Sequence, residues 1–261
     1  MKGAVAWVAQ RRDRTDPERE GMGLSLKAQV KRLIPPRLYN SMLLAFPALY
    51  RTRLVNFESN LEPEGGFEDL LEILDGALAV QGDLIECGSS RCGTTVFIAQ
   101  FLARRGERRK IYACDSFEGF DREEFRSEKA LGLTTVPETV FTSTSYEYVV
   151  RKIRRLGFED WVIPIPGYFR ETLPTLTRSL ELCLGFVDCD LRKSVSYCAE
   201  QLWPRLNPGG ILIFDDYRSP DFRGARLAID EFVASHQGEI ARAESMRWLY
   251  RVQKITGGRR S

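Results

Sequence analysis

From about residue 67 the chain alternates short apolar runs with segments of helical periodicity, and this alternation restricts its fold more than any other feature. The apolar runs predict five strands, at 83–88, 110–115, 161–167, 184–190 and 211–217. Strands that alternate with helices form a parallel sheet with right-handed crossovers and with helices on both faces. The sequence therefore predicts an α/β fold built on a mostly parallel sheet.

The remaining segments complete the predicted order of elements. The last of them, 239–255, holds two apolar stretches without a helix between them and predicts an antiparallel strand pair. Residues 116–145 are polar and aromatic with little periodicity, which predicts a long loop, either a lid over the site or a surface excursion. The predicted helices lie at 67–80, 94–106, 145–158, within 170–183, and at 194–210 and 222–237.

The residues ahead of this alternation differ from the rest in charge. The first 55 residues contain 11 Lys and Arg against 4 Asp and Glu, whereas the whole chain has a net charge of +2. We predict a flexible tail over 1–22, with Met1 or Met22 as the true start, a proline-broken helical cap over 23–66, and one domain over 67–261. The cap either packs on the core or a partner subunit, or lies on a membrane surface as a basic amphipathic element.

Composition narrows the class of protein. A net charge near zero provides no general field for nucleic acid, and no apolar run reaches the 18 residues of a membrane span. The six cysteines form no CxxC pair, and the single histidine, His236, excludes a His-rich zinc site. These features predict a cytoplasmic protein with reduced thiols.

A glycine-containing turn, ECGSSRCGT, follows the first predicted strand and leads into a helix. Gly88 and Gly93 let the backbone turn tightly and approach a ligand closely. Asp115 ends the second strand, where a carboxylate can accept hydrogen bonds from ribose hydroxyls. Because the turn lacks the three-glycine fingerprint for a diphosphate and the lysine of a triphosphate-binding loop, it favours S-adenosylmethionine over a dinucleotide. The alternative is an ordinary strand-to-helix turn, with Asp115 as a helix N-cap.

Pairs of aspartates follow two strands that should be neighbours in the sheet. FVDCDLRKS carries Asp188 and Asp190, and ILIFDDYRS carries Asp215 and Asp216. Carboxylates gathered at one sheet edge repel one another unless a cation lies between them, and oxygen ligands suit Mg²⁺. We therefore predict a magnesium site, with Asp188 and Asp190 on the same side of their strand and Cys189 turned into the core. The alternative is a polar turn after one strand and a helix N-cap after the other.

Five segments in this order resemble the macrocin O-methyltransferase family, which includes sugar methyltransferases of antibiotic biosynthesis. They are ECGSSRCGT, YACDSFEGF, PGYFRETLP, FVDCDLRKSV and LNPGGILIFDDYRSPDFRGARLAIDEF, and the resemblance covers roughly residues 58–255. It implies a class I methyltransferase fold, Rossmann-like with a seven-stranded sheet. It also implies S-adenosylmethionine, Mg²⁺ and methylation of a sugar hydroxyl.

The resemblance assigns roles position by position. Asp188, Asp215 and Asp216 match metal ligands, and Asp190 matches the acid that acts as general base, so that Asp188 and Asp190 are the candidate catalytic pair. The candidate cofactor contacts are Glu86, Gly88, Ser89, Gly93, Thr94, Asp115 and Ser116.

Two positions depart from the family pattern. Cys92 stands where a glycine is usual, and Arg192 stands where an aromatic residue borders the acceptor site. The second departure indicates an acceptor other than a macrolide or aminocoumarin sugar.

We therefore predict an O-methyltransferase, as a homo-oligomer, with a small-molecule or glycan acceptor. A lipid-linked glycan is one option, if the basic N-terminal segment contacts a membrane surface. A catechol or phenol methyltransferase with the same metal site is an alternative. A non-catalytic nucleoside-binding protein and a nicotinamide oxidoreductase are the alternatives from other classes, and the oxidoreductase would need the missing diphosphate fingerprint.

Overall fold

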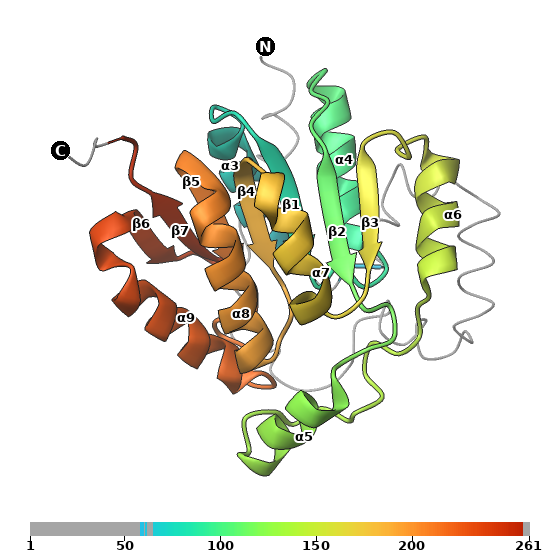
Figure 1. The fold of residues 1–261 in the computed structure, drawn as a ribbon, viewed down its shortest axis with the longest axis vertical. Helices are drawn as coiled ribbons and strands as arrows, with labels where there is room; N and C mark the ends of the chain where they lie inside the picture. Colours follow the sequence, from blue (N-terminus) through green and yellow to red (C-terminus); the bar gives the residue numbers. More distant parts are fainter. Residues whose placement is uncertain (1–57, 60, 62–64, 258–261) are drawn as a thin grey trace, which may run out of the picture. The chain divides into compact units, whose positions relative to one another are not determined.

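The computed structural model describes residues 58, 59, 61 and 65–257, and Figure 1 shows the arrangement of their helices and strands. The predicted tail over 1–22 and nearly all of the predicted cap over 23–66 lie outside these residues. The elements in chain order are α3 (Gly66–Ala77), β1 (Asp83–Cys87), α4 (Gly93–Arg104), β2 (Ile111–Asp115), α5 (Arg122–Ala130), α6 (Tyr146–Leu156), β3 (Val162–Pro166), α7 (Phe169–Leu176), β4 (Leu182–Val187), α8 (Arg192–Leu202), β5 (Leu206–Phe214), α9 (Arg223–Ser235), β6 (Ile240–Ser245) and β7 (Tyr250–Lys254), with 3₁₀ turns at Thr177–Ser179, Trp203–Arg205 and Gln237–Glu239.

Within the described residues, seven strands form one sheet in the order β3-β2-β1-β4-β5-β7-β6. Strands β1 to β5 pair in parallel, whereas β7 pairs antiparallel with both β5 and β6. The strand order reverses between β1 and β4, which is where an open parallel sheet binds its ligand. The predicted α/β fold, the antiparallel end and the seven-stranded sheet implied by the resemblance are confirmed.

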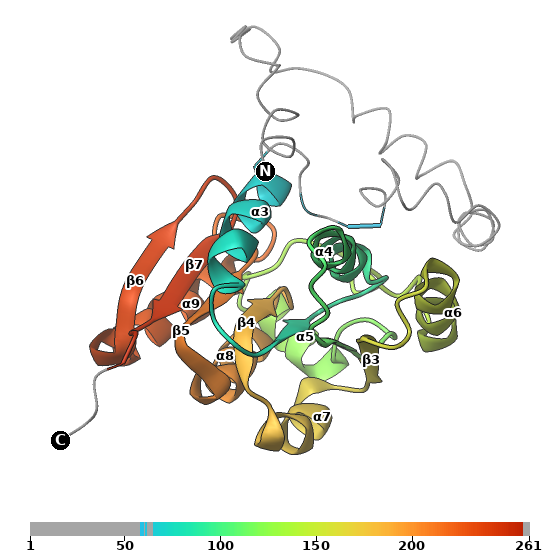
Figure 2. The same ribbon diagram turned by 90° about the horizontal axis from the view of Figure 1, so that it is seen from above.

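Helices cover both faces of the sheet. Successive strand residues point to opposite faces, and because both sets are apolar, each face packs against helices. In β1, Leu84 packs in a core with residues of α3, α4 and α6, whereas Ile85 packs in a second core with residues of α7, α8 and α9. Figure 2 shows the sheet between these two helical layers.

Helix α6 illustrates how the sequence sets an element's ends. Ser145 accepts a hydrogen bond from the Tyr148 backbone N at 3.2 Å and caps the first turn. Gly157 follows the last turn with a φ of 73°, a left-handed conformation that glycine adopts at little cost. The segment therefore begins and ends within two residues of its predicted helix.

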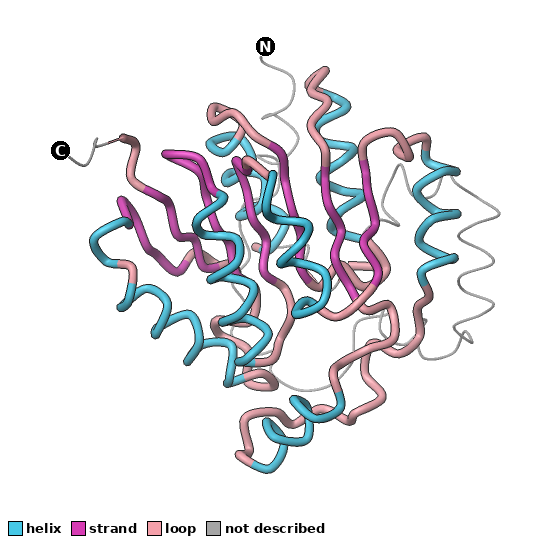
Figure 3. Tube along the Cα trace, in the orientation of Figure 1, coloured by secondary structure: helices cyan, strands magenta, loops and turns pink. Residues whose placement is uncertain are grey.

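The segment 116–145 is not a loop throughout, because it contains α5 (Figure 3). Its sequence, REEFRSEKA, includes one large apolar residue, Phe125, so hydrophobic periodicity could not reveal it. Instead, Asp121 caps the helix by accepting from the Glu124 backbone N at 2.8 Å. Figure 1 shows α5 beyond the carboxyl ends of the parallel strands.

Helix α5 supplies the acceptors that the start of α8 lacks. The N-cap of α8 is Leu191, whose side chain cannot accept a hydrogen bond. Glu124 accepts from both the backbone N and the Oγ of Ser194, at 2.7 and 2.8 Å, and Glu128 accepts from the Arg192 backbone N at 3.0 Å. The segment 116–145 is thus fastened to the sheet edge through the first turn of α8.

The helix predicted over 194–210 is also corrected. It ends at Leu202, and Leu206 already pairs with Leu182 of β4 at the start of β5. Asn207-Pro-Gly-Gly resembles a helix stop, but here it lies within the first half of a nine-residue strand.

None of the described helices is both long and apolar enough to cross a membrane. All six cysteines are buried and unpaired.

Candidate active site

A cavity of about 350 Å³ lies at the carboxyl edge of the sheet, where the strand order reverses. The turn after β1, the end of β2, helix α5 and the starts of α7 and α8 line it. The predicted site residues in this lining are Glu86, Gly88, Ser89, Gly93, Thr94, Asp115, Ser116, Asp188 and Asp190. Asp215 and Asp216 are not in the lining and lie beside Asp188.

Three residues of the glycine-containing turn, Gly88, Ser90 and Cys92, adopt conformations with positive φ. Gly88 has a φ of 93°, and a Cβ at this position would lie 1.7 Å from the Asp188 carbonyl oxygen. Cys92, where the family pattern has glycine, has a φ of 54° and is the N-cap of α4. The family's glycine therefore suits the backbone at this position, and Cys92 adopts the same conformation as a buried side chain.

Asp115 ties two turns together. One carboxylate oxygen accepts from the Ser90 backbone N at 2.8 Å, and the other accepts from the Phe117 backbone N at 2.6 Å. Burial raises the pKa of Asp115, and these two hydrogen bonds oppose the rise. Asp115 caps no described helix, so the N-cap alternative is wrong, and its contact with a ribose stays a prediction.

The lining also contains a polar atom that lacks a protein partner. Ser89 Oγ is buried and has no hydrogen-bond partner among the described residues. Thr94 Oγ1, by contrast, is bonded to Ser59 Oγ at 2.7 Å, and Ser116 Oγ donates to the Gly119 carbonyl at 2.6 Å. An unpartnered hydroxyl, a glycine turn in close contact and a carboxylate at the end of β2 fit a polar nucleoside ligand.

Glu86 is buried at the end of β1, where its carboxylate accepts a hydrogen bond from Thr95 Oγ1. Burial raises the pKa of Glu86 to about 8, and the Thr95 hydrogen bond opposes the rise. Glu86 therefore favours its neutral form near neutral pH.

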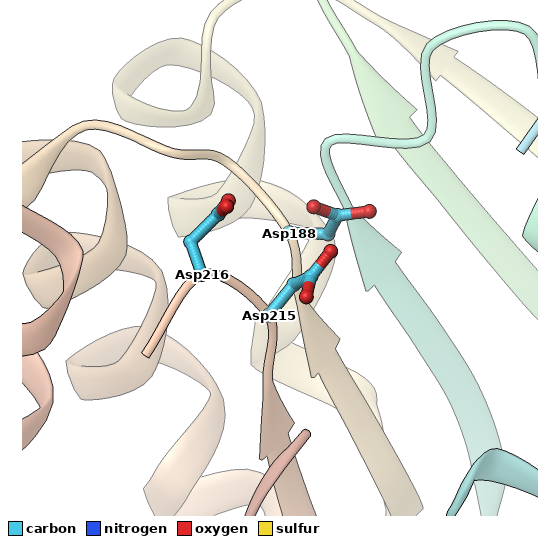
Figure 4. A group of neighbouring side chains, drawn as sticks. All are labelled: Asp188, Asp215 and Asp216. Atoms are coloured by element: carbon cyan, nitrogen blue, oxygen red, sulfur yellow. The ribbon is translucent and has the colours of Figure 1, made fainter. Parts of the chain in front are cut away.

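Three of the predicted acids converge. Asp188, Asp215 and Asp216 each place a carboxylate oxygen within 4.8 Å of the other two (Figure 4). Burial and the charge of Asp215 raise the pKa of Asp188, and burial with the charge of Asp216 raises the pKa of Asp215 to about 7. An all-oxygen donor set whose members repel one another fits a hard divalent cation such as Mg²⁺.

The predicted strand geometry of Asp188 and Asp190 is wrong, because β4 ends at Val187 and both residues follow it. Asp190 has a φ of 62°, so the alternation of side chains along a strand does not apply to it. Burial and the charge of Asp216 raise its pKa. Cys189 is buried in the core between α8 and the sheet, as predicted. The alternative of a DCD N-cap is wrong, because the residue at that position is Leu191.

A buried ion pair near the glycine-containing turn was not predicted from the sequence. Lys152 on α6 pairs with Glu58 and donates to the Arg91 carbonyl at 2.6 Å, and the Tyr148 hydroxyl donates to Glu58. Both charged side chains are at most 1% exposed. The signal was a lysine on the apolar stripe of an amphipathic helix, one turn after Tyr148. The pair holds Glu58 close to the glycine-containing turn.

Many other residues of the cavity lining are aromatic or charged. They include Phe120, Asp121, Glu123, Glu124, Phe141, Tyr168, Phe169, Arg170, Lys193 and Tyr197. Arg192, which departs from the family pattern, is not in this lining, and its guanidinium pairs with Glu231 of α9. The neighbouring residue, Lys193, is the one that lines the cavity.

Comparison with known proteins agrees with this geometry. The family model described as macrocin-O-methyltransferase (TylF) matches residues 68–244, more than half of the chain. The chain belongs to the macrocin-O-methyltransferase family. The resemblance inferred from the five motifs is thereby confirmed.

Two curated relatives show the degree of similarity within the family. The chain is 34% identical over 149 residues to an 8-demethyl-8-(2,3-dimethoxy-alpha-L-rhamnosyl)-tetracenomycin-C 4'-O-methyltransferase of Streptomyces olivaceus, which covers 53% of this chain and 54% of the relative. It is 32% identical over 162 residues to the mycinamicin III 3''-O-methyltransferase of Micromonospora griseorubida, which covers 60% of this chain and 62% of that protein. The chain thus matches between about half and three fifths of the length of these relatives.

Solved structures share the fold. The O-methyltransferase NovP has a TM-score of 0.61 at 22% identity, over 85% of this chain and 100% of that one. CalS11, a calicheamicin methyltransferase, has a TM-score of 0.60 at 17% identity, over 93% and 98%. These two O-methyltransferase structures therefore share the fold that the family assignment implies for this chain.

We expect Lys152→Met to lower the free energy of unfolding by about 3–5 kcal/mol, because it leaves the Glu58 carboxylate buried without its partner. The double variant Glu58→Gln/Lys152→Met should recover much of this loss, because no unpaired charge stays buried. Urea unfolding measures both. Arg105→Met, which removes a surface ion pair with Asp75, is the control and should cost less than about 1 kcal/mol. An equal loss in the single and double variants would contradict the buried pair.

Glu86 should make stability depend on pH. Its folded-state pKa of about 8 lies above the ordinary value of 4.5, so the folded state prefers the protonated form, and this contribution to stability is lost as pH rises from about 4.5 through 8. Glu86→Gln cannot ionise and should gain stability relative to the wild type between pH 5.5 and 8.5. Urea titrations at several pH values test this, with the exposed Glu159→Gln as control. A difference that is constant across pH would refute it.

Proposed function

We propose that the protein is an S-adenosylmethionine-dependent O-methyltransferase that uses Mg²⁺ and methylates a sugar hydroxyl of a natural product or glycan. The observation that carries the proposal is the convergence of Asp188, Asp215 and Asp216 beside a cavity that also contains the glycine turn and Asp115. Family membership and the names of the curated relatives support the same activity.

The side of the cavity that contains the glycine-containing turn and Asp115 would bind S-adenosylmethionine and orient its methyl group. S-adenosylmethionine supplies a methyl group on a sulfonium. Asp115 would accept hydrogen bonds from the ribose hydroxyls while it holds the turns at Ser90 and Phe117 in place. Ser89 Oγ, which has no partner among the described residues, is available to the same ligand, and Gly88 keeps the turn clear of a side chain.

The side of the cavity near the four aspartates would bind the acceptor hydroxyl and remove its proton. Asp188, Asp215 and Asp216 would hold Mg²⁺, which supplies a Lewis acid that lowers the pKa of a sugar hydroxyl. Asp190 lines the cavity and would take the hydroxyl proton as the new C–O bond forms and the methyl–sulfur bond breaks. Glu123 and Glu124 of helix α5 line the same cavity, and α5 would limit the access of water to it. The roles of Asp188 and Asp190 as catalytic pair stay predictions, as do a cytoplasmic location and a homo-oligomer.

We expect Asp188→Asn and Asp215→Asn each to lower turnover by orders of magnitude, because each removes a charged oxygen ligand from the proposed cation site. The affinity for S-adenosylhomocysteine, measured by calorimetry, should stay within about twofold of the wild type, and Asp160→Asn on the surface is the control. EDTA should abolish activity and Mg²⁺ should restore it. Activity that persists in EDTA and in both variants rules out the metal.

Asp115→Asn should weaken the binding of S-adenosylhomocysteine by about 1–3 kcal/mol, the scale of a lost charge-assisted hydrogen bond in a buried site. The 2′-deoxyribose analogue separates a ribose contact from a structural role. The wild type should discriminate against this analogue, and the variant should discriminate less. Equal discrimination in the two proteins would leave Asp115 with only its contacts to Ser90 and Phe117.

A further inference from the structure

One wall of the cavity carries two cations with an aromatic ring between them. Arg170 lies in the first turn of α7, and Lys193 lies in the first turn of α8. Tyr197 follows Lys193 by one helical turn and therefore lies on the same face of α8. The Arg170 guanidinium carbon lies 5.8 Å from the centroid of the Tyr197 ring. All three residues line the cavity, so we call them the basic wall.

The cations of the basic wall are not neutralised by ion pairs. None of the ion pairs formed within the described part of the chain includes Arg170 or Lys193. Both side chains are exposed. Glu128 lies near enough to Lys193 to feel its charge, but one oxygen of its carboxylate already accepts from the Arg192 backbone N. Two cations thus face the cavity without a carboxylate in contact.

The α5 side of the cavity has different chemistry, and it adjoins the basic wall where Glu124 binds Ser194, the residue after Lys193. Asp121 caps α5, Glu124 binds the backbone N and hydroxyl of Ser194, and Glu123 is exposed. Together with Asp188 and Asp190, these acids suit the hydroxyl groups of a sugar, which donate hydrogen bonds. A neutral glycoside would use this acidic side and leave the basic wall without a counterion.

A phosphorylated sugar suits both sides of the cavity, because its hydroxyl groups can donate to the carboxylates and its phosphate can bind the two cations. A guanidinium binds phosphate oxygens in a bidentate manner, and lysine binds them as a point charge. Arg170 and Lys193 lie at the N-terminal turns of two helices, where the partial positive charge of the helix adds to their own. The tyrosine ring between them can stack on a flat group.

We propose that the acceptor carries a phosphate or diphosphate group next to the sugar, and that Arg170 and Lys193 bind this group. The sugar's methylation rests on the proposed function, whereas anion binding by the basic wall does not. The same chemistry occurs in a nucleoside diphosphate sugar and in a polyprenyl diphosphate sugar, so the experiment distinguishes these two sources.

Binding is measured first, by calorimetry in EDTA, so that no cation can link the acids to the phosphates. The probes are inorganic pyrophosphate, a thymidine diphosphate glucose, a short polyprenyl diphosphate glucose and methyl glucoside. Arg170→Gln and Lys193→Gln should each weaken binding of the diphosphate probes about tenfold, and the double variant should weaken it more. Arg104→Gln, at the far end of α4, makes the same charge change and should have no effect. Tighter binding of the nucleoside or of the polyprenyl probe identifies the source.

Turnover supplies a second readout. Lys193→Glu should raise the KM of a diphosphate-linked acceptor at least tenfold and leave kcat within about twofold, while the affinity for S-adenosylhomocysteine stays unchanged. The inference is overturned if the wild type binds none of the diphosphate probes, or if the variants bind these probes as tightly as the wild type does. It is also overturned if a neutral glycoside has the same kcat/KM as the diphosphate-linked acceptor. Failure of the proposed function looks different, because no acceptor would be methylated although the basic wall still binds diphosphate.

Discussion

The site depends on the close approach of two backbone segments at the point where the strand order reverses. The turn after β1 and the turn after β4 meet at Gly88, whose missing Cβ leaves room for the Asp188 carbonyl. Two backbone hydrogen bonds, Gly88 N to Cys114 O and Asp188 N to Cys87 O, both at 2.8 Å, extend the pairing of β1 with its two neighbours to this edge. Gly88, which lies in the glycine-containing turn, therefore also sets the position of Asp188, the first candidate metal ligand. The proposed cofactor side and the proposed metal side of the site share this one contact.

That contact creates an electrostatic cost. It places Asp188 near Asp215, Asp190, Asp216 and Glu86, and burial together with these charges raises its pKa. A structural role does not require such repulsion, because a neutral polar residue would end either strand equally well. The cost is understandable if a divalent cation and a sulfonium, both positive, occupy the space that these acids surround. Glu86 fits the same view, since its raised pKa lets the buried end of β1 stay neutral when no cation is near.

The parts of the fold that hydrophobic pattern controls could be predicted from the sequence. The strands and the helices of the two cores have apolar faces, and the strand-end acids followed from their position after apolar runs. The parts that polar contacts control could not be predicted. Helix α5 has little apolar surface and exists through its Asp121 cap and its glutamates. The turn of Asp190 depends on a left-handed residue that no periodicity indicates, and the pairing of Lys152 with Glu58 joins residues 94 positions apart.

Helix α5 connects these polar contacts to the cavity. Its two glutamates complete the first turn of α8, and that turn begins directly after Asp190 and carries Lys193. A carboxylate at a helix N-terminus is stabilised by the helix dipole, so the capping holds best when α5 stays on the sheet edge. The same helix provides one wall of the cavity through Glu123 and Glu124. The position of the candidate base, the basic wall and the α5 wall of the cavity therefore all depend on the hydrogen bonds between α5 and α8.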